Sequence, residues 1–325
     1  MDLTPEVTRD LYYQMLRIRM CEESLVEPIL SGEVKCPCHL CTGQEAIAVG
    51  VGACLGREDY VFGTHRSHGH YLAKGGDMRR MVAEIFCRST GCAGGRGGSM
   101  HVISAEHGML GAAPIVAGTI SLSVGAALAA KVRGEDRVSV SFFGDGATGE
   151  GVLFESLNLA ALNHLPVLFV CENNLYSTHL RINEIRVSED IFKVAEPFGV
   201  WSRAIDGNDI LKVVEAAGEA IELCRAGGGP AFLECKTYRY RGHVGPDDNI
   251  QGTHTDIRPD AEVAEWKRKD PIERLASHLE KQGFADQAWL ADARSRAEAE
   301  VADALEYARA SEFPAGEEVV RHVWR

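Results

Sequence analysis

The chain has 325 residues, of which 45% are hydrophobic and 25% charged, and its formal net charge at pH 7 is −13. This composition is typical of a globular protein with a large core, and the acidic balance argues against an extended nucleic-acid-binding surface. No apolar stretch approaches the length of a membrane span, and the first residues lack the features of a signal or transit peptide. Ten cysteines without such a signal indicate reduced thiols, so we expect a cytoplasmic protein.

Hydrophobic periodicity predicts the secondary structure in chain order. Apolar residues at helical spacing predict a helical region over 5–30, and shorter helices are expected at 44–55 and 77–88. Helices and strands then alternate, and the expected elements are helix 121–133, strand 137–143, helix 150–163, strand 166–171, helix 209–226 and strand 231–237. Residues 260–325 are charged and alanine-rich, and we expect them to be helical.

This alternation implies right-handed βαβ units, and therefore an α/β fold with a mostly parallel sheet flanked by helices. No low-complexity linker and no internal repeat interrupt the chain. We expect a single α/β domain over 1–325 with helical extensions at both ends, the C-terminal one at 260–325.

Three cysteines lie close together in the sequence beside a histidine, as Cys36, Cys38, His39 and Cys41. A zinc or iron–sulfur site is one interpretation of that spacing. A closed metal site normally draws on two separated ligand pairs, however, and no second Cys-x-x-Cys pair occurs elsewhere. We therefore favour small buried thiols around a functional loop.

The most informative motif follows the strand predicted at 137–143. Gly144-Asp145-Gly146-Ala147 comes directly after that strand, and Asn173-Asn174 follows the next predicted strand. The carboxyl ends of neighbouring parallel strands meet at one edge of a sheet, so an aspartate and an amide should lie close together there. Oxygen ligands beside glycines that permit close backbone approach are suited to a magnesium-bound diphosphate.

In form and spacing this motif resembles that of thiamine-diphosphate enzymes. The resemblance implies Mg²⁺ ligation by Asp145, Asn174 and the backbone carbonyl of Tyr176. The resemblance covers nearly the whole chain. The proteins that the chain resembles are the alpha subunits of thiamine-diphosphate-dependent 2-oxo acid dehydrogenases of the pyruvate and acetoin type. The segments that carry it, besides the cofactor motif, are His39–Ala46, Thr64–His70, Gly94–His101 and Tyr238–His243.

The resemblance also implies roles for individual residues. His39 and His243 match histidines that line the channel above the reactive carbon of the cofactor, where they bind the substrate and move protons. Arg66 matches an arginine on the diphosphate, and its planar fork suits that task. For His68, a place in the site wall and a structural role both stay open. The implied cofactor-binding residues are His65, Arg66, Ile115, Val116, Gly144, Asp145, Gly146, Ala147, Asn174 and His243.

The function implied is formation of an acyl- or hydroxyalkyl-thiamine intermediate, with decarboxylation for 2-oxo acids, and its transfer to a lipoyl acceptor on a separate acyltransferase. Thiamine catalysis needs a carboxylate against the pyrimidine nitrogen, and this chain is too short to contain the second domain that supplies it in single-chain relatives. The resemblance therefore implies a beta subunit, an α2β2 assembly, and no activity of the chain alone. We expect neither nucleic acid nor membrane as partner.

One segment departs from the family pattern. Val244 replaces a serine that kinases modify in mitochondrial relatives, and 244–254 lacks the usual Tyr-Arg pair, which leaves substrate and acceptor open. The alternative function is an acyloin-forming or ketol-transferring subunit of a biosynthetic pathway, with an aldehyde as acceptor. A non-catalytic scaffold is disfavoured because the motifs are intact. A dinucleotide dehydrogenase is disfavoured because Gly94–Gly98 follows no recognisable strand.

Overall fold

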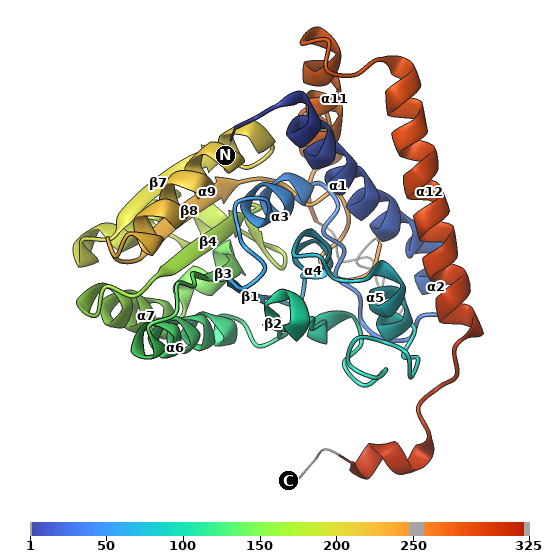
Figure 1. The fold of residues 1–325 in the computed structure, drawn as a ribbon, viewed down its shortest axis with the longest axis horizontal. Helices are drawn as coiled ribbons and strands as arrows, with labels where there is room; N and C mark the ends of the chain where they lie inside the picture. Colours follow the sequence, from blue (N-terminus) through green and yellow to red (C-terminus); the bar gives the residue numbers. More distant parts are fainter. Residues whose placement is uncertain (1, 247–256, 322–325) are drawn as a thin grey trace.

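The structure is a computed structural model that describes residues 2–246 and 257–321 (Figure 1). Its helices are α1 (Pro5–Ser24), α2 (Val26–Leu30), α3 (Glu45–Gly52), α4 (His68–Ala73), α5 (Met78–Ile85), α6 (Gly118–Arg133), α7 (Gly151–Leu162), α8 (Ile182–Ile185), α9 (Ile210–Arg225), α10 (Asp260–Lys267), α11 (Pro271–Lys281) and α12 (Gln287–Ala310). Its strands are β1 (Tyr60–Gly63), β2 (Met109–Ala112), β3 (Ser139–Gly144), β4 (Val167–Asn173), β5 (Tyr176–Ser177), β6 (Leu180–Arg181), β7 (Trp201–Asp206) and β8 (Ala231–Lys236). None of the described helices combines the length and apolar character needed to cross a bilayer.

The main sheet has six strands in the order β2-β1-β3-β4-β8-β7, and every neighbouring pair is parallel. The predicted α/β class with a mostly parallel sheet is therefore confirmed. A two-stranded antiparallel ribbon, β5 with β6, follows β4. The two central strands, β3 and β4, are almost completely buried, which explains why they read as apolar runs in the sequence.

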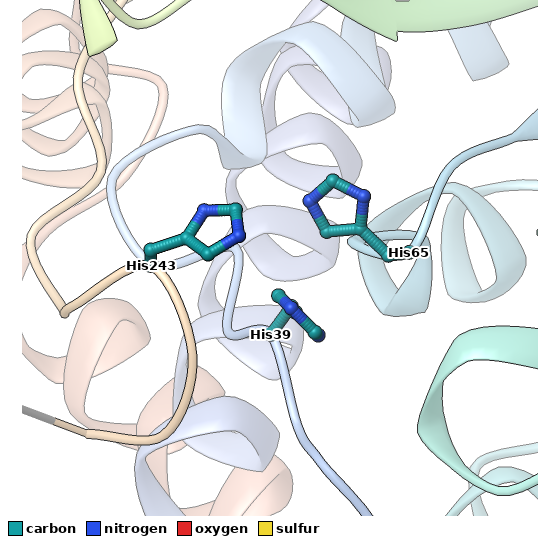
Figure 2. A group of neighbouring side chains, drawn as sticks. All are labelled: His39, His65 and His243. Carbon is teal, nitrogen blue, oxygen red and sulfur yellow. The ribbon is translucent and has the colours of Figure 1, made fainter. Parts of the chain in front are cut away.

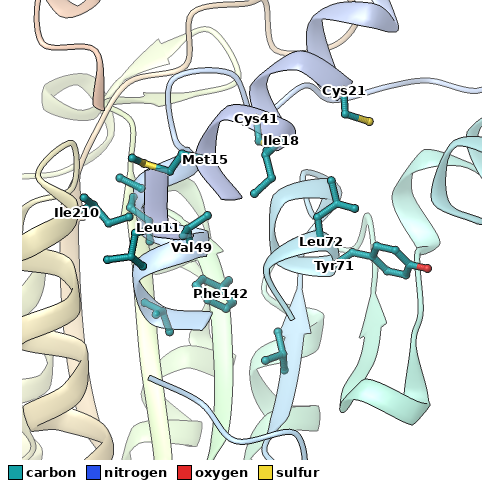
Figure 3. Packing of buried hydrophobic residues seen from close by; sticks show 14 of the residues in the cluster. Leu11, Met15, Ile18, Cys21, Cys41, Val49, Tyr71, Leu72, Phe142 and Ile210 are labelled. Atoms are coloured by element: carbon teal, nitrogen blue, oxygen red, sulfur yellow. The ribbon is translucent and has the colours of Figure 1, made fainter. Parts of the chain in front are cut away.

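Alternate residues of the central strands face two different layers of helices. Val140 and Phe142 of β3 pack in a core with α1, α3 and α9, and Figure 3 shows part of this packing around Phe142. Phe143 of β3 and Phe169 of β4 pack instead against α6 and α7 on the opposite face. This period of two places the sheet between two helical layers (Figure 1).

Most predicted elements are present within a few residues of their expected bounds. The helical region at 5–30 is interrupted at Leu25, between α1 and α2. The region expected to be helical at 260–325 contains α10, α11 and α12. After Ala310, the described residues up to 321 contain one short 3₁₀ helix, Gly316–Val320.

Three strands of the main sheet and helix α4 were not predicted. Strands β1 and β2 have four residues each, too few for a period to be recognised. Strand β7 lies at the edge of the sheet, where all six of its residues are only partly buried, so its composition is mixed. Helix α4 has six residues and begins at His68, inside a His- and Gly-rich stretch that has no helical pattern.

The N-terminal and C-terminal helices pack against each other beside the sheet. Helix α12 contacts both α1 and α5 (Figure 1), and Arg17 of α1 forms an ion pair with Glu300 of α12. Helix α1 also contacts α3 and α4, which border the loops at the carboxyl ends of the strands. The helical extensions thus support the segments that carry the functional side chains.

Candidate functional site

A cavity of about 200 Å³ opens at the carboxyl ends of β1, β3 and β4. Its lining includes every residue that the sequence analysis singled out as catalytic, cofactor-binding or metal-ligating, namely His39, His65, Arg66, Ile115, Val116, Gly144, Asp145, Gly146, Ala147, Asn174, Tyr176 and His243. These residues come from six separate segments of the chain, so their convergence on one cavity is a property of the fold.

The register of β3 and β4 brings Asp145 and Asn174 together. Gly144 pairs with Glu172 across the two strands, so Asp145 and Asn174 lie just beyond the paired ends. Asp145 is 1% exposed, and its Oδ2 has no hydrogen-bond partner among the described residues. Burial raises the pKa of Asp145 to about 6. A buried carboxylate oxygen without a partner, beside an amide, is a donor set that fits a hard divalent cation.

Other contacts fix the amide of Asn174. Its Nδ2 donates to Gln44 Oε1 at 3.3 Å, and its Oδ1 accepts from the backbone N–H of Tyr176 at 3.4 Å. The side chain of Asn174 is 7% exposed. Its oxygen is therefore held at the edge of the cavity beside Asp145.

The turn after β3 is short and tightly packed. The 3₁₀ helix Asp145–Gly149 begins at the end of the strand, and Thr148 Oγ1 donates to the carbonyl of Asp145 at 2.6 Å. A Cβ on Gly146 would lie 2.3 Å from Ser177 Oγ, so only glycine fits there. A Cβ on Gly144 would meet nothing within 4 Å and would stand in the open space of the cavity. The turn thus presents bare backbone to a ligand, as diphosphate binding requires.

Arg66 connects the loops that surround the cavity. It is 5% exposed, and its guanidinium donates to the carbonyl of Leu40 at 2.7 Å and to that of His243 at 3.0 Å. Its backbone N–H donates to Thr64 Oγ1 at 3.1 Å. One arginine therefore joins the segments that carry His39 and His243 to the turn after β1.

Three histidines form a group at this cavity (Figure 2). The ring centroids are 4.5 Å apart for His39 and His65, 5.1 Å for His39 and His243, and 5.4 Å for His65 and His243. Burial, together with the charge of Arg66, lowers the pKa of His65 to about 3 and that of His243 to about 2, and it also lowers the pKa of His39. The three imidazoles are therefore neutral at physiological pH.

His68 has a structural position. Its Nδ1 lies 2.6 Å from Glu22 Oε1 and its Nε2 lies 2.9 Å from Ser99 Oγ, and all three side chains are buried. Glu22 also accepts from the backbone N–H of Cys41 at 2.5 Å. His68 does not line the cavity. Between the two possibilities left open by the sequence, the contacts favour the structural one.

The glycine-rich segment at 94–98 wraps around a carboxylate. Glu84 is fully buried and accepts four backbone N–H groups, those of Ala93, Gly95, Gly97 and Gly98, at 2.7–3.0 Å. These N–H groups are therefore engaged by the protein itself. The glycines are therefore accounted for by close packing around Glu84, and no dinucleotide-binding role is needed to explain them. The segment continues to Met100 in the cavity wall.

The cysteine-rich segment divides in two. Cys36 Sγ lies 3.8 Å from Cys38 Sγ, whereas Cys41 is buried close to Glu22. Burial and this neighbouring carboxylate raise the pKa of Cys41 well above its ordinary value. Cys38 and Cys41 are buried and Cys36 is partly buried, and all ten cysteines are free thiols.

Sequence reasoning gave no role to several polar residues of the cavity wall, among them Gln44 and Glu172. Gln44 holds Asn174, as described above, and it lies within a segment that carries the family resemblance. Glu172 is 5% exposed and its Oε2 lies 3.3 Å from Nε2 of His70. Its position directly before Asn173 was the available signal, since residues at the end of a buried parallel strand face the ligand edge.

Comparisons with known proteins give a consistent picture. The family model described as "Dehydrogenase E1 component" matches residues 13–317. The chain is 40% identical over 324 residues to the alpha subunit of acetoin:2,6-dichlorophenolindophenol oxidoreductase from Bacillus subtilis (strain 168), covering 100% of this chain and 95% of that protein. It is 38% identical over 304 residues to the pyruvate dehydrogenase E1 component subunit alpha of Rhizobium meliloti (strain 1021), covering 93% and 86%. It is 37% identical over 330 residues to the chloroplastic pyruvate dehydrogenase E1 component subunit alpha-3 of Arabidopsis thaliana, covering 99% and 75%.

Proposed function

The chain belongs to the dehydrogenase E1 component family, and from this premise we propose that it is the alpha subunit of a thiamine-diphosphate-dependent 2-oxo acid or acetoin dehydrogenase. The names of its relatives, which are alpha subunits of pyruvate dehydrogenases and of an acetoin oxidoreductase, support this function. The observation that carries the proposal is the single cavity that all the expected site residues line.

Thiamine diphosphate and Mg²⁺ are the proposed cofactors. Asp145, Asn174 and the carbonyl of Tyr176 would hold the metal. The Oδ2 of Asp145, which has no hydrogen-bond partner among the described residues, supports this assignment. Arg66 and the backbone N–H groups after Gly144 would bind the diphosphate. When bound, the cofactor supplies an electron sink for breaking a carbon–carbon bond beside a carbonyl group.

His39 and His243 would act on the substrate. A neutral imidazole donates one hydrogen bond and accepts another, so each ring can bind a carboxylate or carbonyl oxygen and can move a proton. His39 Nδ1 is buried and has no hydrogen-bond partner among the described residues, so it is available to a ligand. His65 lies beside them in the cavity wall. Ile115 and Val116 would contact the aminopyrimidine with their apolar side chains.

A beta subunit is the proposed obligatory partner, in an α2β2 assembly. The matched relatives are themselves named as alpha subunits. Ile115 and Val116 at the cavity are 73% and 53% exposed. Apolar surface of this kind at an active-site mouth is typical of a site that another chain covers. We propose that the partner supplies the activating carboxylate.

A lipoyl-bearing acyltransferase is the proposed acceptor of the acyl group. The alternative, an acyloin-forming or ketol-transferring subunit with an aldehyde acceptor, is disfavoured by the names of the relatives. The departure at 244–254 that suggested it lies mostly outside the described residues. Within that segment, Val244 stands in place of the serine, so regulation by phosphorylation at this position is not expected.

We also propose that residues 1–325 form one domain with 260–325 as its helical extension, since one buried core includes residues from α1 to α12. Ten free thiols support a reducing compartment, and we propose the cytoplasm.

Co-expression with its beta subunit would test the function. The purified complex should reduce an artificial electron acceptor with pyruvate or acetoin when thiamine diphosphate and Mg²⁺ are present. The chain alone should show no turnover, because the activating carboxylate is missing. Turnover by the chain alone would contradict the need for a partner. Product formation from aldehydes only would favour the alternative function.

A further inference from the structure

The three histidines at the cavity bring one ring nitrogen each close together. One ring nitrogen from each of His39, His65 and His243 lies within 4.8 Å of the other two (Figure 2). Among the residues that the structure describes, this is the one trio of His, Cys, Asp or Glu side chains with that mutual spacing. The three side chains come from separate loops.

The nitrogens are close to the spacing that a metal ion requires. A Zn–N bond of about 2.0–2.1 Å in tetrahedral geometry places ligand nitrogens about 3.4 Å apart. Small rotations of the three rings would shorten the distances between these nitrogens from at most 4.8 Å to the value that a metal requires. His39 Nδ1 is buried without a hydrogen-bond partner among the described residues, and such a nitrogen gains a great deal from a metal.

The charge of the surroundings permits a cation. Besides the neutral histidines, the charged residues of the cavity lining are Arg66, Asp145 and Glu172, that is, two carboxylates and one guanidinium. Arg66 is the nearest positive charge and lowers the affinity for any cation. Only a metal with a strong preference for imidazole nitrogen can overcome that repulsion.

We propose that His39, His65 and His243 form a binding site for a divalent transition metal of the zinc class, with its fourth position open to the cavity. Three neutral nitrogens select Zn²⁺, Co²⁺, Ni²⁺ or Cu²⁺, whereas Mg²⁺ prefers oxygen ligands such as Asp145 and Asn174. The site therefore differs from the proposed magnesium site in the same cavity. Its consequence, inhibition by a metal that occupies His39 and His243, rests on the proposed function, whereas metal binding itself does not.

Titration of the metal-free, full-length chain with Co²⁺ tests the proposal. One equivalent should bind with the visible absorption bands of a tetrahedral nitrogen site, and Zn²⁺ should displace it, whereas a large excess of Mg²⁺ should not. His65→Gln and His243→Gln should each weaken binding at least tenfold and abolish these bands. His164→Asn, at an exposed histidine outside the cavity, is the matched control and should bind as the original chain does.

Three results would overturn the proposal. They are the absence of stoichiometric binding, full binding by both cavity variants, and thiolate-to-cobalt charge-transfer bands. The last would place the metal at Cys36 and Cys38 instead, whose sulfurs lie 3.8 Å apart.

A second measurement needs no variant and covers the case in which the substitutions disturb folding. X-ray absorption spectroscopy of the zinc-loaded chain should report three imidazole ligands, and a shell of oxygen or sulfur atoms alone would contradict the proposal. All of these readouts are independent of turnover. Failure of the metal site is therefore distinguishable from failure of the proposed enzymatic function.

Discussion

The two sides of the cavity are positioned in different ways. Asp145 and Asn174 stand at the ends of two hydrogen-bonded strands, so the register of the sheet brings them together. His39, His65 and His243 come from three loops that no strand pairing joins. Backbone pairing positions the residues of the sheet edge, whereas other contacts must position the three histidine loops.

Hydrogen bonds from buried side chains position these loops. Arg66 ties the loops of His39 and His243 through backbone carbonyls, Glu22 holds His68 and the loop after His39, and Glu84 holds the glycine-rich segment. Because side-chain tethers can be removed singly, the loop side should respond strongly to point substitutions. The two sides can therefore be disturbed separately.

The largest effect on stability is expected at Glu84. Glu84→Gln replaces an acceptor oxygen with an amide, which leaves two of the four backbone N–H groups without an acceptor and costs about 4 kcal/mol of unfolding free energy. Urea denaturation measures the loss. Glu106→Gln, whose side chain is 50% exposed in an ion pair with Arg80, is the matched control and should cost less than about 1 kcal/mol. Equal losses for the two variants would refute the tethering role.

At the sheet edge, removal of the Asp145 carboxylate should stabilise the protein when no Mg²⁺ is bound. The pKa of Asp145 is about 6 when folded against an ordinary value of 3.8. The folded state therefore binds more protons between these values, and stability falls as pH rises through that window, by about 3 kcal/mol. Asp145→Asn removes this cost. In the absence of Mg²⁺, the unfolding free energy of the variant relative to that of the original chain should therefore rise between pH 4 and 6.

Unfolding free energies of both proteins at pH 4.5 and pH 7.5, with a chelator present, measure this gain. Asp136→Asn, at a side chain that is 77% exposed, should show no such pH dependence. A difference between Asp145→Asn and the original chain that stays constant with pH would show that the carboxyl is not held in a costly environment.

The histidine side should respond to pH in the opposite direction. The pKa of His65 is lowered to about 3 from 6.5, so the unfolded chain binds more protons between these values and stability falls as pH decreases below 6.5. Between pH 8 and pH 5 the original chain should lose about 2 kcal/mol relative to His65→Gln. Denaturation curves at both pH values test this, with the exposed His164→Asn variant as control. Parallel pH profiles of the original chain and His65→Gln would mean that the ring is not kept neutral.

A smaller effect is expected at Ser99. Ser99→Ala leaves Nε2 of the buried His68 without its partner, at a cost of about 1.5 kcal/mol. Thermal unfolding, compared with Ser121→Ala at an exposed position, measures it. If the two serine variants had the same stability, the Glu22–His68–Ser99 chain would not be holding the loops.

The sheet edge and the histidine side of the cavity also differ in how far they could be predicted from the sequence. The apolar runs at β3 and β4, with polar residues directly after them, were enough to predict that Asp145 and Asn174 share one edge. The histidines were identified only through the family resemblance, because no local pattern relates three loops far apart in the chain. That all of them line the same cavity is a finding of the structure.

The supporting contacts were beyond sequence reasoning. His68 is 46 residues from Glu22 and 31 from Ser99, and these partners are chosen by tertiary packing. The role of Glu84 was equally hidden, since a glutamate within a helix is ordinarily exposed. The edge strand β7 escaped recognition for the related reason that its half-buried residues show no alternation.

The most direct test of the account is a calorimetric titration of the complex of this chain and its beta partner with thiamine diphosphate, with and without Mg²⁺. Binding should require Mg²⁺, and Asp145→Asn should weaken it by roughly 100-fold or more, since even residues that only support metal ligands cost 10–100-fold when changed. Asp136→Asn should bind normally. Tight binding by Asp145→Asn, or binding by the original complex that is indifferent to Mg²⁺, would contradict the assignment of this sheet edge as a magnesium–diphosphate site.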